Sequence, residues 1–202
     1  MRLIAENLAC VRGGRTIFEG LSFDVPGGEG LVLRGPNGAG KTSLLRTLAG
    51  FIPPATGRIA LDGGAPDTPV GEQAHYVGHL NGVKRALTVS ENLRFWATYL
   101  GGDGFEESLG RLDLLALRDI PAGLLSAGQA RRLGLARLHL VPRPVWFLDE
   151  PSVSLDSASQ AILAGLIEAH MRGGGLVLAA THVPLGLDLA RELVLGKQGV
   201  PA

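Results

Sequence analysis

The sequence lacks the features that would place it outside the cytosol or on a nucleic acid. It has one cysteine, Cys10, so no internal disulfide can form, and we expect this small residue on an N-terminal strand. No apolar run reaches the roughly 18 to 20 residues that span a bilayer, and the N-terminus has no signal-peptide pattern. The 19 basic residues equal the 19 acidic ones, which leaves no broad positive surface for nucleic acid. We therefore expect a cytosolic chain without a nucleic-acid partner.

The length and the hydrophobic patterns predict one α/β domain. The 202 residues suffice for one buried core but not for two full ones. Up to Pro26 the apolar residues alternate around glycine and proline turns, which predicts antiparallel strands, whereas residues 90–140 have a helical period. The other expected elements are strands at 30–34, 145–148 and 176–180, helices at 41–48 and 157–171, and a last helix after Pro184.

A glycine-rich loop follows the first of these strands and opens the helix at 41–48. It fits the pattern G-x-x-x-x-G-K-[ST], in which glycines let backbone N–H groups surround phosphates at a helix N-terminus. Lys41 would supply a charge to the β- and γ-phosphates, and the Thr42 hydroxyl would bind Mg²⁺. An ordinary glycine turn is the alternative, but the flanking strand and helix favour a site for ATP and Mg²⁺. The expected nucleotide-binding residues here are Gly35, Pro36, Asn37, Gly38, Ala39, Gly40, Lys41, Thr42 and Ser43.

Two carboxylates end the apolar strand at 145–148. Asp149 should orient Mg²⁺, and Glu150 should act as the general base that polarises the attacking water. Doubly wound sheets bind ligands at this carboxyl edge of their strands. A solvated acidic turn is the alternative, which the phosphate loop at 35–42 disfavours.

The segment Leu125–Gln129 resembles the LSGGQ signature of ABC ATPases, and residues 131–137 continue as the signature helix of that family does. A serine hydroxyl and a glycine backbone at a helix N-terminus form a second anion site, which binds the γ-phosphate held by another subunit. Hydrolysis would therefore require a homodimer. Ala127 replaces a glycine of the family pattern, and a serine-capped helix in an unrelated ATPase is the alternative. The residues expected at this second site are Ser126, Ala127, Gly128 and Gln129.

The resemblance implies a P-loop NTPase core of the ABC ATPase type, with an N-terminal antiparallel β-subdomain and an inserted α-helical subdomain. We expect residues 1–202 to form a single ABC ATPase domain. Residues 1–78 and 141–202 would form the nucleotide-binding core with the β-subdomain. Residues 79–140 would form the helical subdomain that carries the signature motif.

Two further segments match the ABC pattern. Ser154-Leu155-Asp156 resembles the D-loop, which lies across the dimer interface, although Asp156 is also a good helix N-cap and the two roles can coexist. His182 follows the strand at 176–180 and resembles the switch histidine, which would contact the γ-phosphate and act in catalysis with Lys41 and Glu150. The remaining histidines have no such support: His75, His79, His139 and His170.

The sequence departs from the family pattern at two positions. Leu80 occupies the place of a glutamine that binds Mg²⁺ and the lytic water, so His79, Asn81 or water would have to substitute. Gln73 lies before the strand that precedes these residues and is expected at the surface. Arg12 stands where an aromatic residue stacks on adenine, and its planar guanidinium could stack instead.

Several dipeptides narrow the resemblance. Gly78-His79, Val83-Lys84 and Leu87-Thr88, followed by residues 91–96, resemble the ATP-binding subunit of the cytochrome c maturation (haem exporter) system. That likeness implies a peripheral subunit at the cytoplasmic face of the bacterial inner membrane, docked on integral permease-type subunits of the complex. ATP hydrolysis there supports release of the haem-loaded chaperone. The subunit itself is not expected to bind haem.

This transport ATPase is the first hypothesis for the function. An ATP-binding subunit of a generic small-molecule exporter is the alternative within the same class. A soluble ABC protein of translation or DNA repair usually has two cassettes or basic surfaces, which this neutral single cassette does not show. A regulatory module without catalysis is a third possibility, motivated by Leu80.

Overall fold

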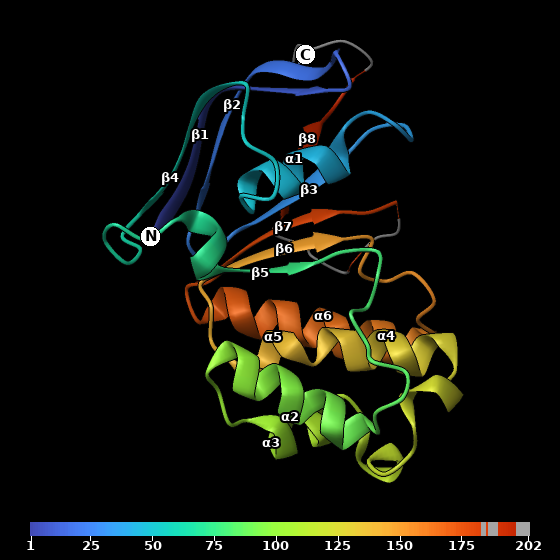
Figure 1. The fold of residues 1–202 in the computed structure, drawn as a ribbon. Helices are drawn as coiled ribbons and strands as arrows, with labels where there is room; N and C mark the ends of the chain where they lie inside the picture. Colours follow the sequence, from blue (N-terminus) through green and yellow to red (C-terminus); the bar gives the residue numbers. More distant parts are fainter. Residues whose placement is uncertain (183–184, 186–189, 197–202) are drawn as a thin grey trace.

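Two β-sheets and the helix Lys41–Leu48 share one hydrophobic cluster in the computed structural model, which describes residues 1–182, 185 and 190–196 (Figure 1). The antiparallel sheet has the order β2-β1-β4, and the second sheet has the order β5-β6-β7-β3-β8 with parallel pairing throughout. The antiparallel strands are β1 (Arg2–Arg12), β2 (Arg15–Pro26) and β4 (Thr56–Asp62). The parallel strands are β3 (Gly30–Arg34), β5 (Ala74–Val77), β6 (Val145–Asp149), β7 (Leu176–Ala180) and β8 (Ala190–Val194).

The central strands β6 and β7 are buried on both faces and divide the core into two clusters. Val145 and Phe147 point to the side of the antiparallel sheet and α1 (Lys41–Leu48), while Trp146 and Leu148 point to the helical side. Neighbouring side chains of a strand face opposite sides of a sheet, which explains this division. The continuous apolar sequence of these strands therefore serves two separate cores.

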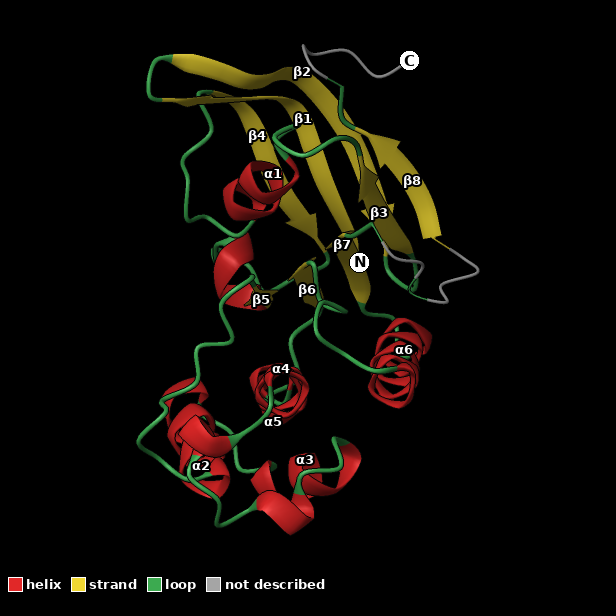
Figure 2. Ribbon diagram, turned by 90° about the vertical axis from the view of Figure 1, so that its right-hand side faces the viewer, coloured by secondary structure: helices red, strands yellow, loops and turns green. Residues whose placement is uncertain are grey.

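The helices on the other side of the parallel sheet form most of the lower part of the molecule (Figures 1 and 2). The helix α2 begins with a capping box, in which Thr88 and Glu91 each accept a backbone N–H, and Gly101 ends it in the left-handed conformation. In the described part of the chain, every helix is too short or too polar to cross a bilayer. The helices there are α2 (Val89–Leu100), α3 (Phe105–Arg111), α4 (Ala127–Leu135), α5 (Arg137–Leu140) and α6 (Ser157–Arg172), with short 3-10 turns at Leu115–Leu117 and Ala122–Leu124.

The elements expected from the sequence are present, with three differences. Strands β4 and β8 were not predicted, and the expected last helix after Pro184 begins outside the described residues. The expectation that Gln73 lies at the surface is wrong, because its side chain is buried at the end of the 3-10 helix Val70–Gln73. Its amide bonds the backbone of Ala65 and Thr68, so the turn before the helix supplies the partners that water would otherwise supply. Cys10 is buried on β1, as expected.

Candidate functional site

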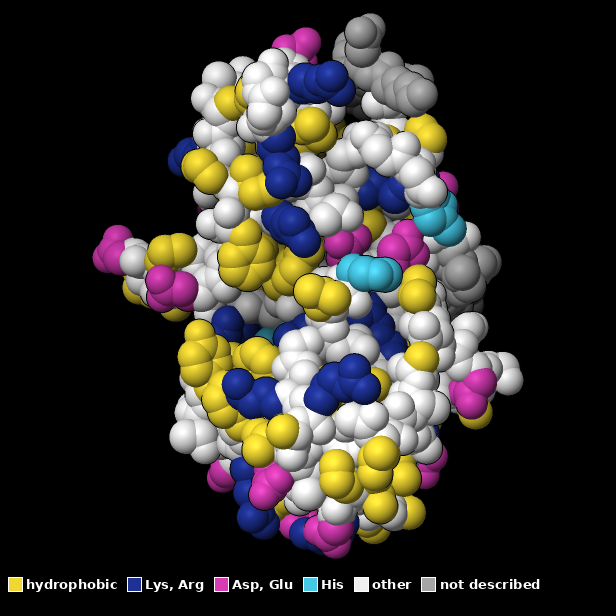
Figure 3. All heavy atoms as spheres, turned by 45° about the vertical axis from the view of Figure 1, so that its right-hand side comes forward, with side chains coloured by type: hydrophobic (Ala, Val, Ile, Leu, Met, Phe, Trp, Pro, Cys, Tyr) yellow, Lys and Arg dark blue, Asp and Glu magenta, His cyan; other side chains and the backbone are white. Residues whose placement is uncertain are grey.

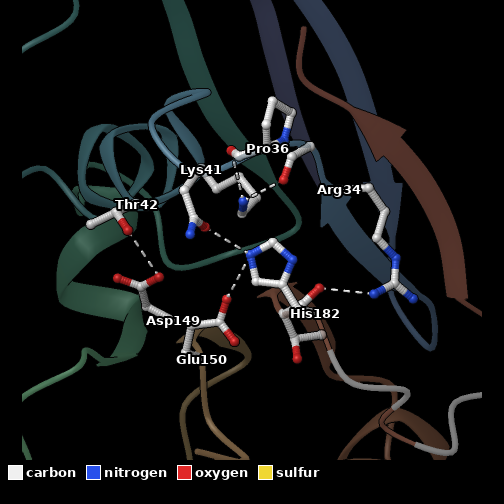
Figure 4. A network of polar contacts seen from close by, with 10 residues as sticks. Arg34, Pro36, Lys41, Thr42, Asp149, Glu150 and His182 are labelled. Atoms are coloured by element: carbon white, nitrogen blue, oxygen red, sulfur yellow. Dashed lines mark hydrogen bonds and ion pairs between the residues drawn. The ribbon is translucent and has the colours of Figure 1, made fainter.

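The carboxyl ends of β3, β6 and β7 meet at one edge of the parallel sheet and bring the predicted phosphate-handling residues together (Figure 4). The phosphate loop leaves β3, the two carboxylates follow β6, and His182 follows β7. Parallel strands place all their carboxyl ends at one edge, so residues more than 100 positions apart become neighbours there. The site therefore combines segments that the sequence identified separately.

The phosphate loop has the backbone that its glycines permit. Gly35 has a φ of 137° and Gly40 a φ of 101°, which side chains other than glycine rarely adopt. A Cβ at Gly40 would lie 2.7 Å from Ile17 Cγ2, and one at Gly35 would clash with the Leu195 carbonyl. The buried Lys41 ammonium donates to the carbonyls of Gly35 at 2.6 Å and Pro36 at 3.2 Å. Lys41 thus lies inside the loop, at the start of α1, where an anion is favoured.

Asp149 is buried and its two oxygens are held from different elements. The Thr42 hydroxyl donates to Oδ1 at 3.0 Å, and the Tyr76 hydroxyl donates to Oδ2 at 3.3 Å. Burial raises the pKa of Tyr76, which keeps its phenol protonated as a donor. The hydroxyl of Thr42 and the carboxylate of Asp149 are hard oxygen donors of the kind that bind Mg²⁺ alongside water and phosphate oxygens. The pair fits a Mg²⁺ site.

Glu150 and His182 face each other across the same edge. His182 Nε2 lies 3.6 Å from Glu150 Oε1 and 3.1 Å from Asn37 Oδ1 in the phosphate loop. Glu150 has a φ of 48°, a left-handed conformation that costs about 1–3 kcal/mol for a residue with a side chain. Such strain persists only where surrounding contacts enforce it. The Glu150 N–H donates to the Ala180 carbonyl at 2.8 Å, which is one of those contacts.

Two residues at this edge were not identified from the sequence. Arg34, the last residue of β3, donates to the Thr181 carbonyl at 2.8 Å and pairs with Glu192 on β8. The Thr181 carbonyl belongs to the residue before His182, so Arg34 anchors the peptide that carries this histidine (Figure 4). Tyr76 on β5 is the second, through its bond to Asp149. The position of Tyr76 at the end of a strand that leads to the site was the only available signal.

The signature segment and Asp156 lie at the starts of other helices. Ser126 Oγ accepts the Gln129 N–H and Gln129 Oε1 accepts the Ser126 N–H, which together form a capping box at the start of α4. Asp156 caps α6 by accepting the Ser159 N–H at 2.8 Å, and hydrogen bonds from the Ser159 side chain and backbone lower the pKa of Asp156. The capping role foreseen for Asp156 is confirmed. A Cβ at Gly128 would lie 2.9 Å from the Ser154 carbonyl, so the signature and D-loop segments adjoin each other.

The remaining candidates occupy exposed or peripheral positions. Arg12 is exposed at the end of the β1–β2 hairpin, whose Ile17 lies against Gly40 of the phosphate loop. Leu80 is 83% exposed and His79 is also exposed. Asn81 Oδ1 accepts a bond from Arg131 of α4. In the phosphate loop itself, the Ala39 and Ser43 side chains are buried, so their backbone would be what faces a phosphate.

The fold and the sheet-edge site are those of a P-loop ATPase. The family model described as ABC transporter matches residues 18–153. A solved structure of an ATP-binding subunit of an ABC transporter superposes with a TM-score of 0.84 at 23% identity, covering 96% of this chain and 86% of that one. An ABC transporter ATP-binding protein from Pyrococcus furiosus gives a TM-score of 0.82 at 24% identity, covering 96% of this chain and 98% of that one.

Curated relatives are more similar and cover nearly the whole chain. The cytochrome c biogenesis ATP-binding export protein CcmA of Rhodopseudomonas palustris (strain BisB5) is 52% identical over 97% of this chain and 98% of its own length. The protein of the same name from Mesorhizobium japonicum is 50% identical over 98% of this chain and 100% of its own length. The chain therefore belongs to the ABC transporter family and, within it, to the family of cytochrome c biogenesis ATP-binding export proteins. It is a nucleotide-binding ABC ATPase.

Proposed function

We propose that this chain hydrolyses MgATP at two composite sites of a homodimer, and that hydrolysis drives release of a haem-loaded chaperone in cytochrome c biogenesis. The arrangement that carries the proposal is the sheet edge, where Lys41, Asp149, Glu150 and His182 converge on the start of α1. The names of the relatives, which call them cytochrome c biogenesis export proteins, support the cargo. The pairing of His75 with Val141 and the stacking of His170 on Trp146 support the view that these histidines do not ligate haem.

Each candidate residue of the nucleotide site has a distinct proposed role. The N–H groups of the loop and Lys41 bind the β- and γ-phosphates, and Arg12 stacks on the adenine. Thr42 and Asp149 hold Mg²⁺, which when bound neutralises charge on the phosphate oxygens. Glu150 takes the proton of the attacking water, and His182 holds the γ-phosphate in line with that water. The bound phosphates would replace the loop carbonyls as partners of the Lys41 ammonium.

The signature segment completes the site of the opposite subunit. Ser126 and Gly128 stand at the start of α4, where the helix dipole and free N–H groups favour an anion. Residues 126–129 and Asp156 therefore serve the γ-phosphate bound to the phosphate loop of the partner. The helical region at 79–140 acts as the movable subdomain, and residues 1–78 and 141–202 form the core that binds nucleotide.

A groove between the nucleotide-binding core and the helical region is the proposed docking site for the integral membrane subunits. It has a volume of about 670 Å³, and its wall includes the exposed or half-buried side chains of Phe51, Tyr76, Leu80, Trp96 and Tyr99. Hydrophobic and basic side chains gather where the upper part of the molecule meets the helical part (Figure 3). Exposed apolar clusters of this kind mark protein interfaces. Docking there would hold the chain at the cytoplasmic face of the inner membrane.

The test combines purified protein with cells that lack the corresponding gene. With its membrane subunits, the wild-type chain should hydrolyse ATP and should restore haem-stained c-type cytochromes. Glu150→Gln and Lys41→Ala should do neither. A chain that hydrolyses ATP normally but restores no cytochrome would favour a generic exporter. ATP turnover that Glu150→Gln does not lower would refute the catalytic assignment.

A further inference from the structure

The guanidinium of Arg131, on α4, is buried, and each of its N–H groups has a hydrogen-bond partner. Its side chain is 3% exposed, and arginine carries five N–H donors and no acceptor. All five donors have oxygen partners within 3.4 Å, drawn from one segment that follows β5 and another at the end of β6. These partners are the Gly78 carbonyl and Asn81 Oδ1 on Nη1, the Asp149 and Glu150 carbonyls on Nη2, and the Pro151 carbonyl on Nε.

The two segments have different tasks. Residues 78–81, here called the linker, begin the connection from β5 to α2, and residues 149–151 carry the carboxylate assigned above to the attacking water. Arg131 itself belongs to the helix that begins at the signature motif. One planar group therefore joins the linker, the signature helix and the end of the catalytic strand.

The bond from Arg131 to the Glu150 carbonyl is short, at 2.7 Å, and it acts on a strained peptide. Glu150 has a positive φ, and its N–H is held by the Ala180 carbonyl of β7. Arg131 holds the other side of the same residue. These two bonds fix the backbone from which the Glu150 side chain extends toward His182.

The side chains of the linker leave Arg131 as the connection between the linker and the end of β6. Leu80 points to solvent, and Asn81 uses its amide oxygen to accept the Arg131 N–H. We propose that Arg131 is a positioning residue for ATP hydrolysis, which transmits movement of the linker and of α4 to the backbone of Glu150. The proposal rests on the role of Glu150 as the catalytic carboxylate.

Lysine could not replace this group. It has three donors on a single nitrogen, whereas the five oxygens lie around a planar fork. Arg131→Lys keeps the charge and most of the length but leaves at least two carbonyls without a partner. The substitution should therefore loosen Glu150 while leaving the phosphate loop intact.

The adjacent Arg132 provides a matched control. Its Nη1 donates to the Leu112 carbonyl and to Asp113, both within the helical region. Arg132→Lys changes the same helix by the same chemistry but does not touch residues 149–151. A general destabilisation of α4 would affect both variants, whereas loss of the Glu150 support would affect only one.

The experiment measures kcat, KM and the Kd for a fluorescent ATP analogue on the full chain, with folding checked by near-ultraviolet circular dichroism. Arg131→Lys should lower kcat about tenfold or more and leave the Kd within about twofold, as expected for an interaction needed mainly in the transition state. Arg132→Lys should match the wild type. Equal losses in both variants, a wild-type kcat for Arg131→Lys, or a fall in affinity that accounts for the loss would overturn the proposal.

Two further variants keep the test decisive. If Arg131→Lys does not fold, Asn81→Ala removes one acceptor from the linker, and wild-type turnover in that variant counts against the proposal. Glu150→Gln is measured in parallel. If Glu150→Gln retains turnover, the catalytic assignment itself fails. If Glu150→Gln is inactive and Arg131→Lys is unimpaired, only the positioning role is lost.

Discussion

At the sheet edge, hydrogen bonds from the phosphate loop, β5 and β3 already hold Lys41, Asp149 and the peptide before His182, respectively, whereas Ser126 and Asp156 cap the helices that they begin. Both regions place helix N-termini where an anion would be stabilised. They differ in what one chain can complete by itself. The sheet edge contains the lysine, the candidate metal ligands and the carboxylate together, whereas the signature region supplies the proposed second anion contact.

Because of this difference, the sheet edge should be rigid and the signature helix should be the part that moves. The sheet-edge residues stand at the ends of buried parallel strands, which cannot shift without disturbing both core clusters. The signature helix α4 belongs to the helical region and is tied to the sheet edge by the guanidinium of Arg131. Nucleotide binding should therefore depend on one chain, and hydrolysis on two.

The largest expected effect comes from Glu150→Gln. Removing a general base lowers turnover by about 10²–10⁴-fold, and ATP affinity should stay within about threefold because the phosphate loop is unchanged. Phosphate release and equilibrium binding measure the two quantities. Glu168→Gln, on the exposed face of α6, is the control and should keep full turnover. A joint loss of affinity and turnover in Glu150→Gln would break the separation between binding and chemistry.

Mixing two inactive variants tests the composite site. In a dimer of a Lys41→Ala chain with a Ser126→Ala chain, one site carries both defects and the other carries none. Random pairing makes about half of the dimers mixed, so about one quarter of wild-type activity should return. Each variant alone should stay inactive, and so should a mixture of Lys41→Ala with Glu150→Gln, because both defects lie on the same half of the composite site and no intact site forms. No recovery in the Lys41 and Ser126 mixture would mean that each chain works with its own signature.

Local backbone demands explain what the sequence could predict. The loop at 35–42, the carboxylates after β6 and the caps of α4 and α6 depend on a few neighbouring residues, so their pattern identifies them. Strand β8 has the sequence ARELV and pairs on one side with β3. Its charged residues interrupt the apolar pattern by which a strand is recognised in a sequence. Gln73 and Arg131 look like surface residues until the folded chain supplies their partners. Tertiary contacts of this kind leave no periodic signal.

A change of pH tests how firmly the helical region is attached to the sheet. His75 of β5 is buried and its Nε2 lies 2.7 Å from the Val141 carbonyl, just after α5. Burial lowers the pKa of His75 to about 4, and the positive charges of Arg143 and Arg137 act in the same direction. The folded state thus keeps this histidine neutral below the pKa of about 6.5 that it has when unfolded.

Acid should therefore destabilise the folded chain. The free energy of unfolding should be highest above about pH 6.5 and should fall by about 3 kcal/mol as the pH drops to about 4, because only the unfolded chain gains the proton. Urea unfolding at several pH values measures this slope. His75→Gln can still donate to Val141 and should flatten it, while His79→Gln, at an exposed position, should not. An unchanged slope in His75→Gln would show that the acid sensitivity arises elsewhere.

The smallest effect is expected at Tyr76, which links the groove side of β5 to Asp149. Tyr76→Phe keeps the ring packed against Phe51 but removes the donor to Asp149 Oδ2 and the acceptor of the Arg46 Nε–H. One net hydrogen bond is worth about 0.5–1.5 kcal/mol, so the Mg²⁺ concentration that half-saturates ATP hydrolysis should rise about two- to tenfold. Binding of Mn²⁺ followed by electron paramagnetic resonance should weaken in parallel.

Tyr99, the other tyrosine of the chain, provides the comparison for this last variant. It lies exposed on α2 and stacks on Phe95, so Tyr99→Phe removes a hydroxyl far from Asp149 in the sequence and on another element. Its Mg²⁺ dependence should equal that of the wild type. If both variants shift equally, the sheet edge does not hold Asp149 through Tyr76, and Thr42 alone must orient the carboxylate. A shift confined to Tyr76→Phe would extend the rigid region from β6 to β5, where the linker to the helical region begins.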